Sequence, residues 1–356
     1  MPAERGSPSI NPTVLHLIPQ DGIGGAEIAA RSATLDLDAN VHVHAMFNGL
    51  YTGEGATANP HLTGNDTGFA FSPKSLSGAI RTARELDPAV VVFSLWRTFG
   101  AFVAFKLLFR KCKFVTFVHN ERVANPVDRI VTAIMRAFSD EIWVDSQATL
   151  DARLSPSQKQ RSRIISLKLD RPAATPRQSA EPKFIYWGRL AQQKRIDRAI
   201  DLFAAVANSN ADARFLLAGP DHGVKADLLA QAEKLGIADR VTILDPVGRD
   251  EIADLAKDAR FFLQLSDHEG MAMGVVEALQ HALVPVVTPV GQMAVYCKDG
   301  ENALIFDGHE STAKRLAGIM ADRDAYAEMS AAALATFADD PIYVEDVVAA
   351  ARELAA

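Results

Sequence analysis

The segment Ser266-Asp-His-Glu-Gly-Met-Ala-Met-Gly-Val-Val-Glu277 lies between two short apolar runs of the sequence. The first run, Arg260–Leu265, comes directly before it. The second run, Val284–Thr288, follows a helical pattern that extends from about Val275 to Leu283. Two apolar strands joined by a loop and a helix are typical of a parallel sheet. Because open α/β sheets bind their ligands at such junctions, we expect a binding site here.

Two carboxylates of this segment occupy different places, Glu269 in the loop and Glu277 in the first turn of the predicted helix. Gly270 and Gly274 allow the backbone to pass close to a ligand, and the free amides at a helix start can bind an anion. These features predict a site for an anionic, hydroxyl-rich ligand such as a sugar nucleotide. A structural alternative remains open, in which Gly274 caps the helix, Glu277 stabilises its dipole and Glu269 faces water.

Short apolar runs alternate with longer helical patterns along the whole chain, as they do in parallel α/β folds. Six such runs precede the Pro-rich segment 171–182 and six follow it. Residues 49–75 are rich in Gly, Thr, Asn and Pro, and we predict that they form a loop.

The pattern therefore predicts an α/β protein with two Rossmann-like domains that face each other across a cleft. The N-terminal domain is expected over 1–170, the linker over 171–182 and the C-terminal domain over 183–335. A final helix within 336–356 is expected to pack back on the N-terminal domain.

Length and composition exclude several classes of protein. The chain has 356 residues, 48% of them hydrophobic, and a formal net charge of -7, whereas nucleic-acid-binding domains are basic. Its two cysteines, Cys112 and Cys297, form neither a disulfide framework nor a zinc motif. Residues 1–12 are polar, unlike a signal peptide. The longest apolar stretch, Phe99–Phe109, is shorter than the roughly 20 residues that cross a bilayer. We expect a soluble protein of a reducing compartment.

Two positions at predicted strand ends in the first half are candidates for ligand contact. Gly24-Gly25 follows the first strand and permits a tight turn whose amides face the expected cleft, although turns use glycine widely. His119 comes directly after the strand Lys113–Val118, although a single histidine at such a place also fits a structural role.

The strand after the linker ends in Gly188-Arg189-Leu190, and Lys194-Arg195 comes just before the next helix. Arginine binds phosphate oxygens in a bidentate fork, and lysine adds a point charge. Cations at a helix N-terminus oppose the helix dipole, and an anionic ligand would remove that conflict. We therefore predict phosphate binding here, with a solvated helix start as the structural alternative.

Together and in this order, these elements resemble the retaining glycosyltransferases of family 4, which have the two-domain GT-B fold. The resemblance covers most of the chain and is strongest from Ile185 to Phe306. The matching elements are Gly24-Gly25, His119, Gly188-Arg189-Leu190 with Lys194, Gly219-Pro220, Glu269 with Glu277 as the Glu-x7-Glu pattern, Pro285-Val286-Val287 and Asp299-Gly300-Glu301-Asn302. The chain departs from the family at Glu269-Gly270-Met271-Ala272, where the usual pattern is Glu-Gly-Phe-Gly, which leaves the donor sugar open.

The resemblance implies a role for each matching position. Arg189 and Lys194 would neutralise the donor diphosphate, and Glu277 would bind the ribose hydroxyls. Glu269 and His119 would act at the transferred sugar as catalytic residues. Backbone contacts to the diphosphate are expected at Gly24, Gly25, Gly274 and Val275, and contacts near the donor sugar or nucleotide at Gly188, Gly219, Gly270, Met271, Ala272 and Met273. Members of this family use neither a metal nor a cofactor, because cations and helix amides carry the charge of the leaving group.

The implied function is transfer of a hexosyl group, with retention of configuration, from a nucleotide-diphosphate sugar to an acceptor. The expected acceptor is a cell-envelope glycan or a lipid-linked molecule, as in polysaccharide or lipopolysaccharide biosynthesis. Two other functions remain open: a sugar-nucleotide epimerase with the same fold, and a catalytically silent module that binds sugar nucleotides or a membrane surface.

The stretch 88–120 contains no acidic residue. Its cations are Arg97, Lys106, Arg110, Lys111 and Lys113, and they lie among phenylalanines that share one face of a predicted helix. Anionic headgroups attract such clusters by about 1 kcal/mol per cation. We therefore expect a cytoplasmic protein attached through its N-terminal domain to the cytoplasmic face of the inner membrane. The alternative is a core helix with a basic end.

Overall fold

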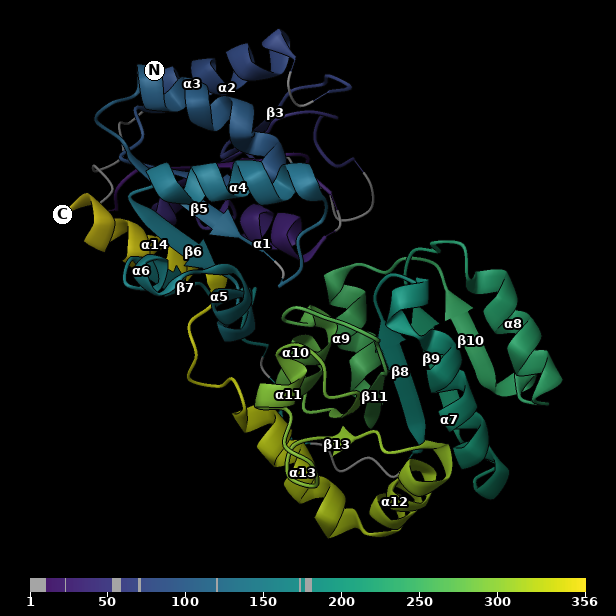
Figure 1. Cartoon of the computed structure of the whole chain (residues 1–356). Helices are drawn as coiled ribbons and strands as arrows, with labels where there is room; N and C mark the ends of the chain where they lie inside the picture. Colours follow the sequence, from purple (N-terminus) through teal and green to yellow (C-terminus); the bar gives the residue numbers. More distant parts are fainter. Residues whose placement is uncertain are drawn as a thin grey trace, which may run out of the picture. The chain divides into compact units, whose positions relative to one another are not determined.

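The computed structural model describes residues 11–22, 24–52, 59–69, 72–119, 121–172, 174–176 and 181–356, except for the side chains of residues 249 and 250. The chain divides into two compact units, each built around its own parallel sheet (Figure 1). The first unit combines Met1–Asp170 with Pro341–Ala356, and the second is Arg171–Asp340. The predicted α/β class with two Rossmann-like domains is confirmed.

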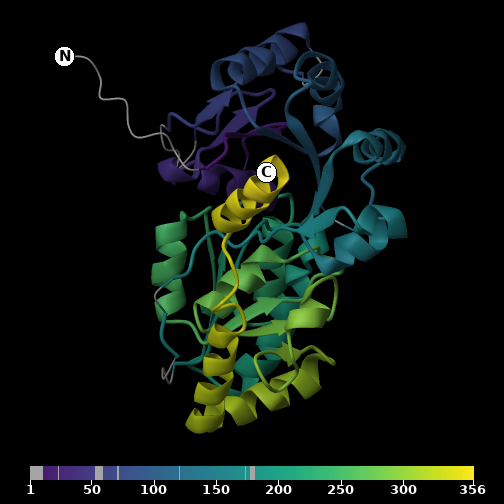
Figure 2. The same cartoon turned by 90° about the vertical axis from the view of Figure 1, so that its left-hand side faces the viewer.

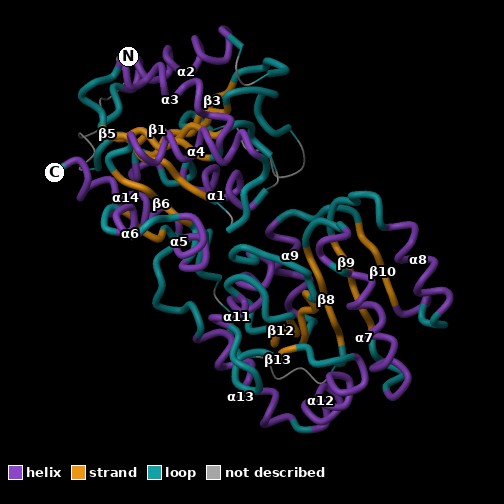
Figure 3. The backbone as a smooth tube through the Cα atoms, viewed as in Figure 1, coloured by secondary structure: helices purple, strands orange, loops and turns teal. Residues whose placement is uncertain are grey.

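The sheet of the first unit has seven strands in the order β3-β2-β1-β4-β5-β6-β7, and Figure 3 draws the strands in orange. The strands are β1 (Val14–Ile18), β2 (Val41–Ala45), β3 (Leu62–Gly64), β4 (Val90–Ser94), β5 (Lys113–Val118), β6 (Glu141–Val144) and β7 (Ser162–Ile164). The loop predicted over 49–75 was wrong only where β3 and the start of helix α2 lie within it, and its residues 53–58 and 70–71 lie outside the described part of the chain. Only the first residue of β3 is buried, so this short edge strand has no apolar alternation that would reveal it.

Helices cover both faces of this sheet. On one face, α2 (Pro73–Leu86), α3 (Phe99–Leu108) and α4 (Pro126–Phe138) share an apolar cluster with Leu15 and Phe93. On the other face, α1 (Gly25–Ala33) packs near Ile18 and Val43. The short elements of this unit are η1 (Leu37–Ala39), η2 (Trp96–Thr98), α5 (Gln147–Arg153) and α6 (Pro156–Lys159).

The last helix, α14 (Tyr343–Ala355), packs on the first unit, against α1 and β4. The amide of Tyr343 donates to the carbonyl of Lys168 at 2.7 Å, and the Asp346 carboxylate accepts from the amide of Ser166 at 2.7 Å. Figure 2 shows this helix in yellow beside the purple N-terminal elements. The first unit is therefore assembled from both ends of the chain.

The second unit contains a six-stranded parallel sheet in the order β10-β9-β8-β11-β12-β13. Its strands are β8 (Lys183–Trp187), β9 (Arg214–Ala218), β10 (Val241–Leu244), β11 (Phe261–Gln264), β12 (Val284–Val287) and β13 (Leu304–Ile305), and each falls on a predicted apolar run. The helices are η3 (Gln192–Lys194), α7 (Ile196–Ser209), α8 (Lys225–Lys234), η4 (Ala238–Arg240), α9 (Arg249–Lys257), α10 (Met273–Gln280), α11 (Met293–Tyr296), α12 (His309–Ala321) and α13 (Arg323–Ala335).

Both sheets reverse their strand order once, between β1 and β4 in the first unit and between β8 and β11 in the second. In open parallel sheets the crevice outside the carboxyl ends at such a reversal is where ligands bind. None of the helices in the described part of the chain is both long and apolar enough to span a bilayer.

Candidate active site

In the second unit, the ends of β8 and β9 approach each other more closely than side chains would allow. Gly188 and Gly219 have φ values of 141° and 147°, in a region that L-residues avoid. A Cβ atom on Gly219 would lie 2.0 Å from the carbonyl oxygen of Gly188. Glycine is therefore required here to let the backbone after β8 turn towards the expected ligand site.

Helix α10 begins two residues earlier than predicted. Its N-cap is Ala272, in the left-handed region with φ 58° and ψ 63°, and its first residue is Met273. Glu277 consequently lies in the second turn, so its predicted place in the first turn was wrong, as was the alternative of Gly274 as the N-cap. The error arose because alanine gives no sequence signal for a left-handed cap.

Gly274 instead serves the packing of α10 on the sheet. A Cβ atom there would lie 3.2 Å from the carbonyl oxygen of Trp187 and equally close to side-chain atoms of Phe262 and Gln264. The amide of Val275 donates to the Ala272 carbonyl at 2.9 Å, and the Val275 side chain is fully buried. The amides of Met273 and Gly274 precede the first hydrogen bonds of the helix and are the groups that can bind an anion.

Lys194 and Glu269, predicted at separate parts of the ligand, form an ion pair. The Lys194 Nζ lies 2.7 Å and 2.9 Å from the two carboxylate oxygens of Glu269. Their side chains are only 15% and 7% exposed. Gln264 Nε2 donates to Glu269 Oε1 at 3.1 Å. The carboxylate is thus oriented by two neighbours, and a phosphate that reached Lys194 would share its ammonium group with Glu269.

Glu277 has a partner that the sequence analysis missed. The indole Nε1 of Trp187 donates to Glu277 Oε2 at 2.9 Å. Trp187 is the last residue of β8, is 4% exposed, and packs against Phe262 with 4.5 Å between the centroids of the two tilted rings. A tryptophan directly before the Gly188 turn was the only sequence signal for this contact, because donor and acceptor are 90 positions apart.

The loop that carries Glu269 is pressed against the start of α11. Gly291 has φ 55°, and a Cβ atom on it would lie 2.2 Å from the carbonyl oxygen of Glu269. The amide of Gln292 donates to the Gly270 carbonyl at 3.0 Å, and the Tyr296 hydroxyl donates to the Met271 carbonyl at 2.8 Å. These contacts, which the sequence analysis missed, stabilise the loop over 269–272.

Arg189 is exposed, and among the described residues no carboxylate lies within ion-pairing distance of it. Its backbone is anchored, since the Tyr186 hydroxyl donates to the Arg189 carbonyl at 3.0 Å. Arg189 thus has a fixed backbone and a guanidinium without a carboxylate partner among the described residues. Such a group is well suited to bind an incoming phosphate.

In the first unit, Gly24 is the N-cap of α1 and Gly25 its first residue. A Cβ atom on Gly24 would lie 2.1 Å from Glu27 Oε2, so the Glu27 side chain folds back over the helix start. A carboxylate of the protein itself therefore lies next to the helix start whose amides were predicted to bind diphosphate. Glu27 stands at the third helical position, where a carboxylate stabilises the N-terminus, and the sequence analysis did not identify it.

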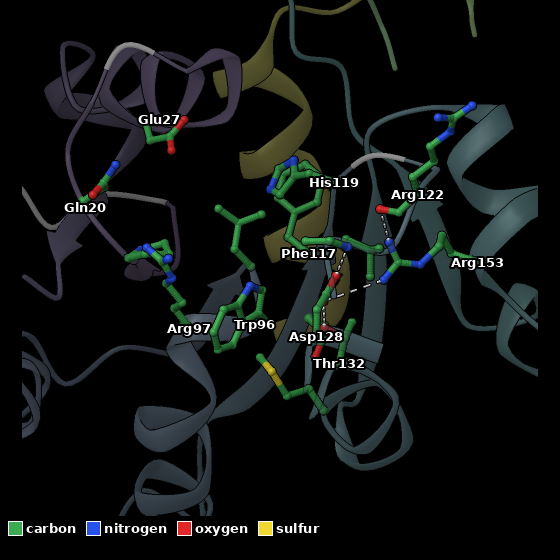
Figure 4. A pocket seen from close by; sticks show the side chains of 16 residues that line it. Gln20, Glu27, Trp96, Arg97, Phe117, His119, Arg122, Asp128, Thr132 and Arg153 are labelled. Carbon is green, nitrogen blue, oxygen red and sulfur yellow. Dashed lines mark hydrogen bonds and ion pairs between the residues drawn. The ribbon is translucent and has the colours of Figure 1, made fainter. Parts of the chain in front are cut away.

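His119 follows β5 and lines a cavity of about 200 Å³ at the carboxyl ends of β1, β4 and β5 (Figure 4). Its ring is 8% exposed, and its Nε2 lies 3.0 Å from Ser94 Oγ. Burial lowers the pKa of His119 to about 4, an effect that the nearby Asp145 carboxylate partly opposes. At neutral pH the ring is uncharged and acts through hydrogen bonds.

The same cavity contains charged residues that the sequence analysis did not single out. Arg153, with a side chain 6% exposed, donates to the Arg122 carbonyl at 3.2 Å and lies 3.9 Å from Asp128 Oδ1. Asp128 also accepts from Thr132 Oγ1 at 2.7 Å. Figure 4 shows these side chains on the side of the cavity opposite Gln20 and Glu27.

The backbone next to this cavity is strained. Leu95, one of its lining residues, has φ 63° and ψ 153°, a combination that is essentially restricted to glycine. Such strain persists only where surrounding contacts impose it and is concentrated at functional sites. It occurs at the end of β4, one residue after Ser94.

Most of the second unit is similar in sequence to a known family of domains. Residues 170–336 match the family of group 1 glycosyl transferases. The matched residues include the four charged residues of the predicted site: Arg189, Lys194, Glu269 and Glu277. The candidates Gly24, Gly25 and His119 lie in the first unit, outside the matched residues.

Two curated relatives match part of this chain. A GDP-mannose:cellobiosyl-diphosphopolyprenol alpha-mannosyltransferase from Komagataeibacter xylinus is 34% identical over 115 residues, which is 32% of this chain and 29% of the relative. A D-inositol 3-phosphate glycosyltransferase from Mycobacterium sp. (strain KMS) is 30% identical over 148 residues, 40% of this chain and 33% of the relative. The chain thus spans about a third of the length of each.

Solved structures match over nearly the whole chain and show the GT-B fold. Anabaena Alr3699/HepE in complex with UDP has a TM-score of 0.74 at 16% identity, covering 96% of this chain and 98% of that one. Sucrose-phosphate synthase from Thermosynechococcus elongatus has a TM-score of 0.71 at 16% identity, covering 96% and 97%. The region that matches the group 1 family therefore lies in a chain with the two-domain GT-B fold. Within the described residues, no three His, Cys, Asp or Glu side chains gather in a metal-binding arrangement.

Proposed function

We propose that this protein is a retaining glycosyltransferase of family 4 that moves a hexosyl group from a nucleotide-diphosphate sugar to a glycan or lipid-linked acceptor. The observation that carries the proposal is the grouping of Lys194, Glu269 and Glu277 around the start of α10. Gln264 contacts Glu269, Trp187 contacts Glu277, and Gly274 packs against both Gln264 and Trp187. Anabaena Alr3699/HepE, a protein of similar structure, forms complexes with UDP and with UDP-glucose, which supports this donor class.

Each group in this arrangement suits one part of the donor. The exposed Arg189, with Lys194 and the amides of Met273 and Gly274, would bind the diphosphate and stabilise the charge it gains as it leaves. In this proposal the protein itself supplies the positive charge that compensates the leaving diphosphate, without a metal ion or cofactor. Glu277, oriented by Trp187, would accept hydrogen bonds from the ribose hydroxyls. Glu269 would contact the transferred sugar.

In this proposal the acceptor attacks the sugar from the same face from which the leaving group departs, and the configuration is therefore retained. The donor sugar would pass through an oxocarbenium-like state, and stabilising the departing diphosphate would be the main electrostatic task. The contact of the Lys194 ammonium group with the Glu269 carboxylate supports this role for Lys194, because Glu269 is the residue proposed to contact the sugar.

The cavity of the first unit suits an acceptor that carries phosphate. Arg97 and Arg122 are exposed at this cavity, and no ion pair within the described chain occupies either guanidinium. Arg97 lies over the rings of Trp96 and Phe47 at 5.4 Å and 5.8 Å. The names of both curated relatives specify phosphorylated acceptors, a cellobiosyl-diphosphopolyprenol and an inositol 3-phosphate. We therefore favour a phosphorylated acceptor here as well.

The apolar face of α3 and α4 favours attachment to a membrane surface. On α4, the exposed side chains Val127, Ile130, Ile134 and Phe138 follow helical spacing, with 53%, 62%, 38% and 65% exposed. On α3, which contacts α4, Leu107 and Leu108 are 74% and 52% exposed. Exposed apolar side chains that gather on neighbouring helices are typical of an interaction site.

The cations predicted to serve this attachment divide into two groups. Arg110 and Lys111 follow α3, Lys113 begins β5, and all three are exposed, which fits the proposal. Lys106 instead lies over the Phe114 ring at 4.4 Å and 3.8 Å from Asp140, and Arg97 lines the cavity. We propose that the three exposed cations and the apolar face together dock the protein on the cytoplasmic face of the inner membrane, where a lipid-linked acceptor would be found.

The deciding experiment is mass spectrometry of reactions that contain the full chain, a panel of sugar nucleotides, and either phosphorylated, lipid-linked or no acceptor. A product heavier than the acceptor by one hexosyl residue, absent with Glu269→Ala, supports the proposal. Conversion of the sugar nucleotide into an isomer without acceptor would instead identify an epimerase. Tight binding of a sugar nucleotide with no product from any acceptor would identify a binding module.

A further inference from the structure

Four buried polar groups form a continuous hydrogen-bonded chain through the first unit. The hydroxyl of Tyr343 lies 3.0 Å from His16 Nδ1, His16 Nε2 lies 2.7 Å from Ser94 Oγ, and Ser94 Oγ lies 3.0 Å from His119 Nε2. The four residues are between 1% and 8% exposed. This chain, which we call the histidine relay, begins at the first residue of α14 and ends at the cavity.

Strand register explains how residues so far apart in sequence meet. His16 on β1 pairs with Val92 on β4, and Ser94 on β4 pairs with Phe117 on β5. Because side chains two residues apart in a strand share a face, Ser94 lies beside His16 and one step further along, and His119 lies one step beyond Ser94. The relay therefore crosses three neighbouring strands diagonally, towards their carboxyl ends.

The direction of hydrogen bonding in the relay can be deduced from its fixed end. Burial lowers the pKa of His16 to about 3 and of His119 to about 4, so at neutral pH each ring has one N–H and one acceptor nitrogen. The Tyr343 hydroxyl is buried, and His16 Nδ1 is the acceptor that the structure offers it among the described residues. A buried hydroxyl without an acceptor is unfavourable. Tyr343 therefore donates to His16 Nδ1.

The positions of the hydrogens on His16, Ser94 and His119 can then be assigned one after another. His16 has its hydrogen on Nε2 and donates to Ser94 Oγ, so the single hydroxyl hydrogen of Ser94 is donated to His119 Nε2. The His119 hydrogen must then be on Nδ1. In the described part of the chain, Nδ1 of His119 is shielded from solvent and has no hydrogen-bond partner, while its ring lines the cavity.

We propose that Tyr343, His16 and Ser94 are positioning residues that fix His119 as the Nδ1–H tautomer, so that His119 offers a hydrogen-bond donor to a ligand oxygen in the cavity. His119 is then a donor to a sugar hydroxyl or a phosphate oxygen, and it does not remove a proton from the acceptor. The identity of that ligand rests on the proposed function, whereas the tautomer does not.

Nuclear magnetic resonance of the full chain with ¹⁵N-labelled histidine tests the tautomer directly. Two-bond proton–nitrogen correlations distinguish a protonated Nδ1 from a protonated Nε2, and loss of one signal in His119→Asn assigns His119. We expect the Nδ1–H pattern in the wild-type chain near neutral pH. The Nε2–H pattern would overturn the proposal.

Variants of the relay test its cause. Tyr343→Phe removes the fixed donor, and Ser94→Ala removes the link, so each should convert His119 to a mixture of tautomers or to Nε2–H. The matched control is Tyr326→Phe, which deletes another buried tyrosine hydroxyl, one that donates to the Arg260 carbonyl in the second unit. Unchanged His119 signals in both relay variants would contradict the inference.

A sugar-transfer assay tests whether the Nδ1–H group of His119 acts as a hydrogen-bond donor during the reaction. The amide nitrogen of Asn reaches the place of Nδ1 and that of Gln the place of Nε2, so turnover by His119→Asn should exceed that by His119→Gln. We expect His119→Gln to be roughly 100-fold slower than wild type, the loss typical of a removed donor. Equal or faster turnover by His119→Gln would refute a donor role. If the wild type transfers no sugar while the Nδ1–H pattern is observed, the proposed function fails and the tautomer stands.

Discussion

The ammonium group of Lys194 lies 2.7 Å from a carboxylate oxygen of Glu269, and both side chains are largely buried. From the sequence, the two residues were expected to make separate contacts, one to phosphate and one to sugar. Their pairing couples these two parts of the proposed donor site, because any change at one leaves the other with an unbalanced charge.

Substitution of one partner should therefore affect folding as well as binding. We expect Lys194→Met and Glu269→Gln each to lower the free energy of unfolding by about 3 kcal/mol, the cost of an unpaired buried charge. The double variant should recover most of that loss, since neither charge remains. Urea unfolding of all four chains measures the coupling, and additive losses in the double variant would show that the pair has no energetic role.

Arg189 should behave differently, because it is exposed and has no carboxylate partner among the described residues. We expect Arg189→Ala to weaken binding of a nucleoside diphosphate by roughly 1.5–3 kcal/mol, the range for a hydrogen bond to a charged group. Its free energy of unfolding should stay within about 0.5 kcal/mol of wild type. Titration calorimetry measures the affinity, with the exposed Lys234→Ala as the control; equal affinities in the two variants would exclude Arg189 from the diphosphate site.

Trp187→Phe tests whether the indole orients Glu277. The variant keeps the ring packing but removes the hydrogen bond to Glu277 Oε2. We expect the KM for the donor to rise by about five- to tenfold, equivalent to roughly 1 kcal/mol, with little change in kcat. Glu277→Ala should raise the donor KM further, whereas Glu269→Ala should mainly lower kcat. The opposite pattern for the two glutamates would mean that their roles are exchanged.

The first unit should lose stability in mild acid. Burial lowers the pKa of His16 to about 3 and of His42, His44 and His119 to about 4, below the unfolded value of about 6.5. Between these pKa values the unfolded chain binds more protons than the folded one, so the stability present above pH 6.5 declines as pH falls towards 4. Urea midpoints measured across this window should fall steadily, and His44→Gln should reduce the slope. A midpoint independent of pH would contradict these shifts.

The exposed face of α3 and α4 gives a separate prediction about membranes. Ile130→Ser and Phe138→Ser together should abolish flotation with anionic vesicles at low salt, because they remove apolar surface that is 62% and 65% exposed. The matched control is Val295→Ser in the second unit, which is 54% exposed. If the wild-type protein floats equally with neutral and anionic vesicles, a role of Arg110, Lys111 and Lys113 in membrane binding is excluded.

Local patterns were sufficient to predict most strands, and the reason is visible in β8 to β13. Most of these strands are short, apolar and largely buried, so their runs stand out from the surrounding helices. The short edge strand β3 lacks this property, since only Leu62 is buried. The left-handed cap at Ala272 was also missed, because no residue type there signals it.

Contacts between distant residues were beyond the reach of the sequence. Arg189 and Glu277 were identified from motifs, but Trp187 lies 90 positions from Glu277 and joins it only through the packing of α10 on β8. The histidine relay needs the register of three strands and a residue 327 positions from His16. Both contacts depend on tertiary structure, which periodicity and spacing do not encode.

The placement of α14 has a consequence for synthesis on the ribosome. The first unit needs Pro341–Ala356, yet all of Arg171–Asp340 is translated before that segment. A nascent chain can therefore fold its second unit while the first still lacks the Tyr343 hydroxyl, and His16 then has no donor at its Nδ1. The histidine beside the cavity acquires its final proton arrangement only after the whole second unit has been made, so translation order delays the completion of the N-terminal site.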